Sequence, residues 1–333
     1  MTRDHFEELP TEHRVTAGLA LATAFGATPI EAITPVMGGA SGAWTFRVDL
    51  SRRHYLLRIE GAASPLRNPH QYRSLQIAAQ AGIAPRCHYV DESARIAILD
   101  FVEERPLDSF PGGPLALARA LGEMVRRVQA TPLFPEFIAY PDMVGRLWAW
   151  VCQTGLFAPG VLDPCTERFS RIREICTWES TDLVSSHNDP LPRNILFDGT
   201  RLWMIDWESA YRNDPLVDVA IMLDNFAPEP ALESAFLHAW LGHSTSDGFY
   251  EKLNPVRSLT RLYYAGVLLS ASAAAGRETT DTNLTAPTRA EFEQAVGAGH
   301  LKPGATETKH ILGKMFLNSF LSGDMPPGFS AAV

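Results

Sequence analysis

Lysine is missing from most of this chain. The first lysine among the 333 residues is Lys252, so any cation required earlier must be arginine or histidine. Acidic residues are missing from a shorter stretch, because neither Asp nor Glu occurs between Gly61 and Val90. The two absences limit which charged pairs the N-terminal part can form.

Cysteine is scarce and scattered, and no Cys-x-x-Cys pair suggests a zinc or redox motif. The polar N-terminus, residues 1–10, lacks the apolar core of a signal peptide. The most apolar stretch, residues 262–276, is short for a membrane span and rich in Ala and Ser, so we expect a buried helix there. These features favour a reducing, cytoplasmic setting. The four cysteines are Cys87, Cys152, Cys165 and Cys176.

The charge balance restricts the partners. The net charge of −9 argues against nucleic acid or an anionic membrane as a partner, because both require basic patches. Residues 187–250 carry ten Asp or Glu against three Lys or Arg. This excess would suit a cationic small molecule, although acidic surfaces also serve solubility. The length of 333 residues is enough for two lobes.

What the chain does contain is a dense polar motif at residues 186–207. Asp189 stands five positions before Asn194, and Asp206 follows an apolar run. In kinase-type sites, one Asp accepts the proton of the substrate hydroxyl, while an Asn and a second Asp hold Mg²⁺ against the phosphates of ATP. Magnesium keeps several waters, so two oxygen ligands from the protein suffice.

The spacing of this motif predicts a hairpin. Residues 195–197 and 202–205 read as short strands joined by a turn at Asp198-Gly199. Such a hairpin would bring Asn194, at its start, close to Asp206, at its end. The alternative is a surface hairpin with ordinary polar loop residues.

The sequence His187-Asn188-Asp189-x4-Asn194, followed by Ile205-Asp206-Trp207-Glu208, resembles the aminoglycoside phosphotransferase and choline/ethanolamine kinase superfamily. With Asn213-Asp214-Pro215-x-x-Asp218 it is most similar to bacterial choline kinases. The resemblance implies an α+β, two-lobed protein-kinase-like fold. The N-terminal lobe, residues 1–102, would hold an antiparallel sheet with a helix, and the C-terminal lobe, residues 103–333, would be mainly helical.

The N-terminal segment fits this expectation. Residues 11–25 read as a helix that ends at Gly26, and strands are expected at 31–36, 43–50 and 54–60. The glycine-rich turn between the first two strands would hold phosphate through its free amides, and a plain hairpin turn is the alternative. The turn has no Gly-Lys-Ser/Thr and is not a Walker loop. Its candidate nucleotide-binding residues are Gly38, Gly39, Ser41 and Gly42.

Arg58 is the candidate for the cation that contacts the α- and β-phosphates, a position where protein kinases use Lys. The alternative is an edge-strand arginine that faces solvent. The family's next helix supplies a Glu partner for the cation, but the helix expected at residues 69–81 has no acidic residue. Gln71 stands where we expect the partner and could only hydrogen-bond Arg58.

Two further strands, 86–90 and 95–99, would complete a five-stranded sheet. Residues 100–103 then resemble the hinge between lobes, where the backbone of Asp100 and Val102 would meet adenine. An ordinary strand exit is the alternative. Everything after the Pro and Gly cluster at 111–114 reads as mainly helical. Helices are expected at 115–130, 140–157, 165–178, 231–241, 253–275, 289–297 and 306–321.

The resemblance also implies roles for individual residues. Asp189 would be the catalytic base, and Asn194 and Asp206 would bind Mg²⁺. Asp218 would tether the backbone of the catalytic loop, whereas Asp224 reads as helix surface or cleft rim. Choline recognition needs an aromatic cage for the cation, which Trp240 could join. Core and rim residues are the alternative interpretation of these aromatic side chains. The possible substrate-binding residues are Glu208, Tyr211, Tyr263 and Tyr264.

The predicted function is transfer of the γ-phosphoryl group of ATP, with Mg²⁺, to a hydroxyl of a small, cationic molecule of choline, ethanolamine or aminoglycoside type. Homoserine and sugars remain alternative acceptors. A nucleotide-binding pseudokinase without turnover is a second alternative, favoured by the missing Lys and helix Glu. A protein kinase is disfavoured because neither Asp-Phe-Gly nor Ala-Pro-Glu occurs.

Overall fold

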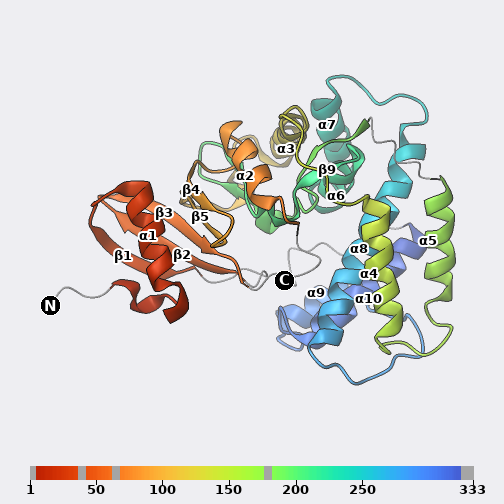
Figure 1. Cartoon of the computed structure of the whole chain (residues 1–333). Coiled ribbons are helices and arrows are strands. Elements are labelled where there is room, and N and C mark those ends of the chain that lie inside the picture. Colours follow the sequence, from red (N-terminus) through yellow and green to blue (C-terminus); the bar gives the residue numbers. More distant parts are fainter. Residues whose placement is uncertain (1–4, 37–42, 62–67, 176–181, 324–333) are drawn as a thin grey trace. The chain divides into compact units, whose positions relative to one another are not determined.

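The computed structural model describes residues 5–36, 43–61, 68–175 and 182–323 (Figure 1). The chain folds as two compact units. The first comprises Met1–Phe110 and Asn194–Tyr211, and the second comprises Pro111–Arg193 and Arg212–Val333. The predicted lobes were continuous stretches, whereas the hairpin after Asn194 belongs to the first unit. It does so because Met204 donates to the carbonyl of Ile83, and Arg105 donates to that of Phe197.

A five-stranded antiparallel sheet forms the first unit, as predicted, with strand order β1-β2-β3-β5-β4. Buried and less buried residues alternate along β2 and β3, which is the period-2 pattern of strands with one face on a core. The strands are β1 (Ile30–Pro35), β2 (Trp44–Leu50), β3 (Arg53–Ile59), β4 (Cys87–Asp91) and β5 (Ile96–Asp100).

Helix α1 (Arg14–Phe25) covers one face of this sheet (Figure 1). Its buried side chains, Ala17, Ala20 and Leu21, join Val48 and Leu57 of the strands in one apolar cluster. The helix ends at Gly26, whose φ of 67° is a left-handed conformation that glycine adopts without a Cβ clash. Two 3₁₀ turns, η1 (His5–Glu8) and η2 (Thr11–His13), precede α1, and the helix predicted from residue 11 therefore begins three residues later.

Arg58 lies between Leu57 and Ile59, which are both fully buried in that cluster. Because side chains alternate along a strand, Arg58 points to the opposite face of the sheet. Helix α2 (Gln71–Gln80) follows β3, and η3 (Leu107–Ser109) follows β5. The predicted hairpin forms from β7 (Ile195–Phe197) and β8 (Leu202–Met204), between the turns η5 (Pro192–Asn194) and η6 (Trp207–Ser209).

The second unit is mainly helical, as predicted. Helix α8 is its longest element at 26 residues, and it contacts α4, α5, α6 and α10. The stretch 262–276 lies within or just after α8, where Leu262, Ala265 and Leu269 are buried. The helices are α3 (Gly113–Gln129), α4 (Tyr140–Gln153), α5 (Asp163–Ile175), α6 (Leu216–Phe226), α7 (Pro230–Leu241), α8 (Phe249–Ala274), α9 (Arg289–Gly297) and α10 (Thr306–Ser322).

Close helix packing depends on glycine at several contacts, of which two illustrate the point. A Cβ on Gly122 of α3 would lie 2.3 Å from the carbonyl oxygen of Phe236 on α7, and one on Gly313 of α10 would lie 2.8 Å from Leu269 on α8. A small sheet of β6 (Val184–Ser186) and β9 (Tyr211–Asn213) accompanies the helices. Among the described residues, no helix has both the length and the hydropathy needed to cross a bilayer.

Candidate functional site

Arg58 is the centre of a charged cluster in the first unit. Its Nε lies 2.6 Å from Oε1 of Glu60, and its Nη2 lies 2.8 Å from Oδ1 of Asp206 and 3.1 Å from Oε2 of Glu208. The Arg58 side chain is 18 % exposed. It is therefore a held arginine and not the edge-strand arginine of the alternative interpretation.

The cluster fixes the charge of Arg58. Burial by itself lowers the pKa of this guanidinium, but the carboxylates of Asp206, Glu60 and Glu208 outweigh burial and raise it. Three carboxylates around one arginine leave an excess of negative charge. Such a site can take up a cation beside Arg58 and, with that cation, an anionic phosphate chain.

Gln71, the expected partner of Arg58, does not fill that role. The prediction was wrong because it looked for a partner only in the helix. The carboxylates that hold Arg58 include Glu60, which stands two residues after it. Residues i and i+2 of a strand lie on the same face, so this spacing was a usable signal. Helix α2 has another function: Asn68, just before it, and Ser74 within it both donate at 2.7 Å to the carbonyl of Ala210.

The β7–β8 hairpin brings the two predicted magnesium ligands together. Ile205, next to Asp206, donates its N–H to the carbonyl of Asn194 at 2.9 Å. Asp206 has φ 64° and ψ 62°, a left-handed conformation that costs a non-glycine residue energy and often marks functional sites. Oδ1 of Asp206 is buried, and no described residue donates an aligned hydrogen bond to it.

This donor set fits a magnesium ion, since carboxylate and amide oxygens are suitable ligands. Asn194, which is 2 % exposed, and Asp206 are the residues that could hold it. Oδ1 of Asp206 also forms the ion pair with Arg58. Within the described ranges, no group of three or more His, Cys, Asp or Glu residues has the arrangement of a metal centre. A two-ligand magnesium site is consistent with that result.

The predicted nucleotide-binding residues can be placed in part. Gly38, Gly39, Ser41 and Gly42 lie outside the described residues. The N–H of Asp100 donates to the carbonyl of Arg86, and its side chain accepts from His88 at 2.7 Å. The amide of Asp100 is therefore used within the sheet, and Val102 lies beyond the end of β5.

A buried carboxylate holds the loop before Asp189 in the second unit. Asp218, in the first turn of α6, accepts from the N–H of His187 and from that of Asn188, both at 2.7 Å. This is the predicted tether. Asn188 has a left-handed φ of 64°, and its side-chain oxygen accepts from Asn213 at 2.7 Å. Burial raises the pKa of Asp218, although the two N–H donors oppose that shift.

Asp189 follows directly in this tethered loop. Its Oδ1 accepts from the hydroxyl of Tyr264 at 2.9 Å, and its Oδ2 lies 3.3 Å from Nη2 of Arg193. The Asp189 side chain is 18 % exposed, so solvent reaches it. A partly exposed carboxylate on a fixed loop is suited to accept a proton from a small molecule.

The predicted aromatic cage is only partly assembled. Tyr263 packs 5.4 Å from Tyr264 and 5.8 Å from Tyr140, measured between ring centroids. Trp240 packs against Phe249 and donates to Gln129, and among the described residues it makes no ring contact with those tyrosines. Tyr211 is 3 % exposed and is grouped with the other compact unit.

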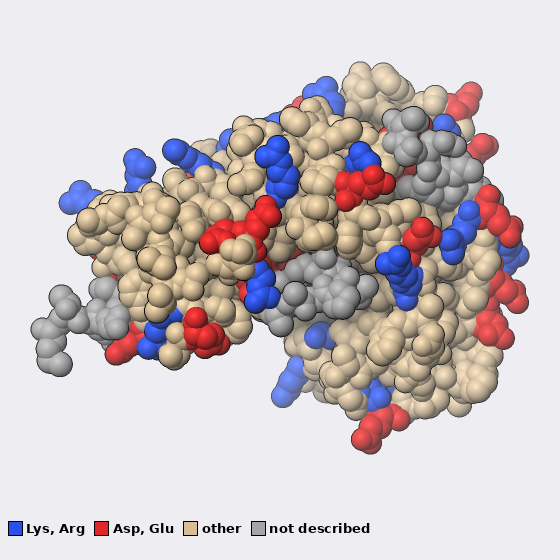
Figure 2. All heavy atoms as spheres, viewed as in Figure 1, with Lys and Arg blue, Asp and Glu red and all other residues tan. Residues whose placement is uncertain are grey.

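Asp224 is not a surface residue. It is 6 % exposed because its carboxylate pairs with Arg261 of α8 through two hydrogen bonds, at 2.8 and 3.1 Å. Asp198 accepts four hydrogen bonds in the hairpin turn. Asp198, Asp218 and Asp224 therefore account for part of the acidic excess at residues 187–250, because their carboxylates bond to other residues of the protein. On the face shown in Figure 2, acidic and basic side chains are interspersed.

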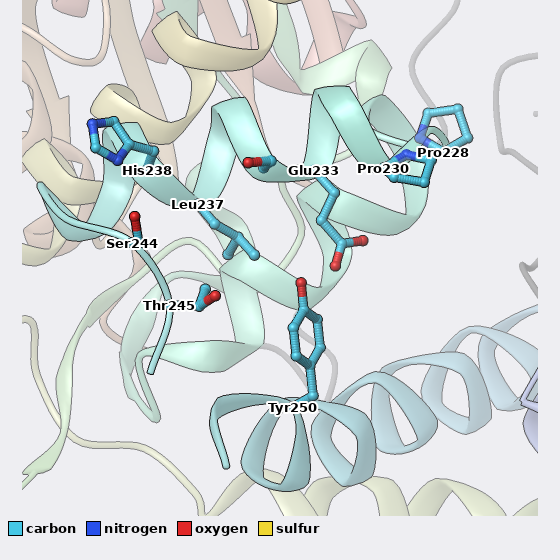
Figure 3. A pocket seen from close by; sticks show the side chains of 9 residues that line it. Pro228, Pro230, Glu233, Leu237, His238, Ser244, Thr245 and Tyr250 are labelled. Atoms are coloured by element: carbon cyan, nitrogen blue, oxygen red, sulfur yellow. The ribbon is translucent and has the colours of Figure 1, made fainter. Parts of the chain in front are cut away.

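A pocket of about 310 Å³ lies where α7, the following loop and the start of α8 meet (Figure 3). Glu233, His238 and Tyr250 contribute its polar groups. The carboxylate of Glu233 is already paired with Arg257 at 2.7 Å. None of the predicted site residues lines this pocket.

Comparison with known proteins identifies the family. A profile of the phosphotransferase enzyme family matches residues 32–252. The chain belongs to this family. The match covers about two thirds of the chain, includes Arg58, Asp189, Asn194 and Asp206, and confirms the superfamily indicated by the motifs.

Curated relatives match this chain over short stretches. An uncharacterized protein of Metamycoplasma hominis is 28 % identical over 156 residues, which are 46 % of this chain and 29 % of that protein. The protein LicA of Haemophilus influenzae is 47 % identical over 38 residues, which are 11 % of this chain and 14 % of LicA. The chain thus aligns with less than a third of either relative's length.

Solved structures match over most of the chain. A choline/ethanolamine kinase family protein from Mesorhizobium loti has a TM-score of 0.62 at 20 % identity, covering 90 % of this chain and 98 % of that one. Spectinomycin phosphotransferase, solved with ADP and spectinomycin, has a TM-score of 0.53 at 14 % identity, covering 79 % and 87 %. At these identities the likeness shows the kinase-like fold.

Proposed function

We propose that this phosphotransferase moves the γ-phosphoryl group of ATP to a hydroxyl of a small molecule. The observation that carries the proposal is the Asp189 carboxylate, held by Tyr264 on a loop that Asp218 tethers through two backbone N–H groups. The spectinomycin phosphotransferase that shares the fold was solved with ADP, which supports an adenine nucleotide as the donor.

In this mechanism the protein positions groups and stabilises charge. Asp189 orients the acceptor hydroxyl and takes its proton as the oxygen attacks phosphorus. Arg58, together with Val102 and the Gly38–Gly42 segment, binds the nucleotide. Asn194 and Asp206 would hold Mg²⁺, which would neutralise charge on the phosphate oxygens.

We further propose that the acceptor is cationic, of choline, ethanolamine or aminoglycoside type. The solved neighbours include a choline/ethanolamine kinase family protein and a spectinomycin phosphotransferase, which supports this class. Tyr263 is partly exposed and adjoins the Tyr264–Asp189 pair, so its ring is the aromatic surface best suited to a cation. Glu208 supplies a further carboxylate with a 31 % exposed side chain.

The pseudokinase alternative rested on the missing Lys and the missing helix Glu. Arg58 paired with Glu60 supplies a cation–carboxylate pair in a different form. This pairing supports turnover over a purely regulatory role.

The test is ADP release from Mg-ATP in the presence of choline, ethanolamine, aminoglycosides, homoserine or sugars. We expect one class of acceptor to stimulate the native enzyme and Asp189→Ala to reduce that rate at least about 100-fold, as for loss of a general base. Asp142→Ala is the matched control, because Asp142 is 53 % exposed and pairs only with Arg173 among the described residues. Equal turnover by Asp189→Ala would refute the mechanism.

A further inference from the structure

The side chain of Tyr264 is enclosed. The residue is 5 % exposed, and its ring lies 5.4 Å from that of Tyr263 and 5.9 Å from that of Phe316. A ring packed in this way offers little surface to a substrate cation. Its hydroxyl, in contrast, donates to Oδ1 of Asp189 at 2.9 Å.

We propose that Tyr264 is a positioning residue, which holds the Asp189 carboxylate in the orientation for proton transfer, and not part of the surface that contacts the acceptor. The proposal rests on the proposed function, since it assigns a role to Asp189. It also separates the two neighbouring tyrosines: Tyr263 contacts the acceptor, and Tyr264 acts through Asp189.

Helices α6 and α8 hold the two partners of the Tyr264–Asp189 hydrogen bond in place. Asp218 at the start of α6 holds the backbone of the loop at His187 and Asn188. Asp224, near the end of the same helix, holds Arg261 of α8 by two hydrogen bonds. Tyr264 stands three residues after Arg261 on α8.

The backbone before Asp189 and the Asp189 side chain are thus held by two helices that are joined through a buried ion pair. Arg261 also donates to the carbonyl of Gly323 at 2.9 Å, which attaches the end of α10 to the same point of α8. Because the links through Asp218 and Asp224 are short and buried, Asp189 has little freedom to rotate away from Tyr264. Preorganisation of this kind lowers the reorientation needed during the reaction.

The hydroxyl also acts on the charge of Asp189. A donor directed at a carboxylate stabilises its ionised form. Burial and the neighbouring Asp189 raise the pKa of Tyr264 well above its usual value, so the hydroxyl stays protonated and remains a donor. Removing it takes this donor away from Asp189, whose other carboxylate oxygen still faces Nη2 of Arg193.

The experiment compares Tyr264→Phe with Tyr250→Phe. Both changes delete one hydroxyl from α8, and the hydroxyl of Tyr250 also points toward a carboxylate, that of Glu233 in the pocket (Figure 3). For Tyr264→Phe we expect kcat to fall roughly 10- to 100-fold, the effect of losing a hydrogen bond to a charged group. We also expect an unchanged KM for ATP and an acid limb of kcat/KM that moves to higher pH. Tyr250→Phe should change none of these.

Two kinetic results would overturn the proposal. If kcat and the pH profile of Tyr264→Phe match those of the native enzyme, the hydroxyl does not position Asp189. If instead KM for the acceptor rises while kcat is unchanged, Tyr264 belongs to the acceptor surface.

A crystal structure of Tyr264→Phe provides a result that does not depend on turnover. We expect the Asp189 side chain to leave its native rotamer or to occupy several, and an unchanged rotamer would refute positioning. If the native enzyme transfers no phosphoryl group to any acceptor, the proposed function fails, while this structural comparison still decides the role of Tyr264.

Discussion

Arg58, in β3, and Glu60, directly after that strand, stand two residues apart, with 2.6 Å between Nε and Oε1. Glu60 is 3 % exposed, so this carboxylate is a fixed part of the site. The Nε of the cation proposed to bind phosphate is therefore held by a residue next to its own strand, whereas its Nη2 is held by Asp206 and Glu208.

We expect Glu60→Ala to raise KM for ATP about tenfold, because Arg58 loses a charge-assisted hydrogen bond that fixes its direction. Glu60→Gln keeps an acceptor for Nε and should retain most of the affinity. Steady-state kinetics at varied ATP and binding of a fluorescent nucleotide measure the effect. Glu293→Ala is the control, because Glu293 pairs with another arginine, Arg289, and is 47 % exposed. Equal loss in the Ala and Gln variants would show that charge, and not orientation, is what Glu60 supplies.

Asp206→Asn should remove the dependence of nucleotide binding on magnesium. The neutral amide is a poorer ligand for a hard cation than a carboxylate. We expect transfer to fall below about 1 % of the native rate, since metal neutralisation of the phosphates is a large part of this catalysis. Titration of Mn²⁺ by electron paramagnetic resonance with ADP present measures the metal directly. Asp198→Asn, at the other end of the hairpin, should bind Mn²⁺ normally. Native metal affinity in Asp206→Asn would show that Asp206 is not a ligand.

The fold could be predicted from the sequence where patterns are local. Alternating apolar residues at β2 and β3, the turn at Asp198-Gly199 and the glycine after α1 all act within a few positions, and each element formed as expected. The catalytic motif was recognisable because Asp189, Asn194 and Asp206 lie within one short stretch. These signals are independent of how distant segments pack.

The contacts that hold the site were less predictable, because they join residues far apart in the sequence. Tyr264 reaches Asp189 across 75 positions, and Arg261 reaches Asp224 across 37. Nothing in the composition of α8 distinguishes a tyrosine that faces a substrate from one that donates to a carboxylate. The Arg58–Glu60 pair, in contrast, could have been predicted, because the two residues are only two positions apart. It was missed because a partner was expected from the helix.

Breaking the Asp224–Arg261 pair should destabilise the second unit strongly. Arg261→Met leaves the Asp224 carboxylate buried, with Arg257 at 3.3 Å as its remaining ion-pair partner among the described residues. We expect the free energy of unfolding to drop by about 3 kcal/mol, at the low end for a broken buried pair. Urea unfolding measures it. Arg289→Met should change it by less than about 0.5 kcal/mol, because Arg289 is 50 % exposed and pairs with an exposed Glu293. A small loss in Arg261→Met would mean that Arg257 replaces it.

A second cluster in the same unit predicts a pH dependence of stability. Asp281 pairs with Arg277, His310 and Lys314, and its side chain is 16 % exposed. Burial by itself raises the pKa of Asp281, but hydrogen bonds from Lys314 and His310 outweigh it and lower the pKa to about 2. Its backbone also bonds to Leu156 and Ala158, which join the segment after α8 to the segment after α4.

A carboxyl group whose pKa is lowered by folding stabilises the folded state. This contribution to the free energy of unfolding is present above the pKa of the unfolded state, 3.8, and is lost as the pH falls toward 2. We therefore expect Asp281→Asn to lower the free energy of unfolding by about 2 kcal/mol at pH 7, from a shift of nearly two units. The difference from the native protein should shrink steadily below pH 4. Denaturant unfolding at pH 7, 5 and 3 measures it. Asp142→Asn, which breaks an exposed pair with Arg173, should show no such trend. A difference that stays constant across this range would mean that Asp281 stabilises the fold through hydrogen bonds that do not require its charge.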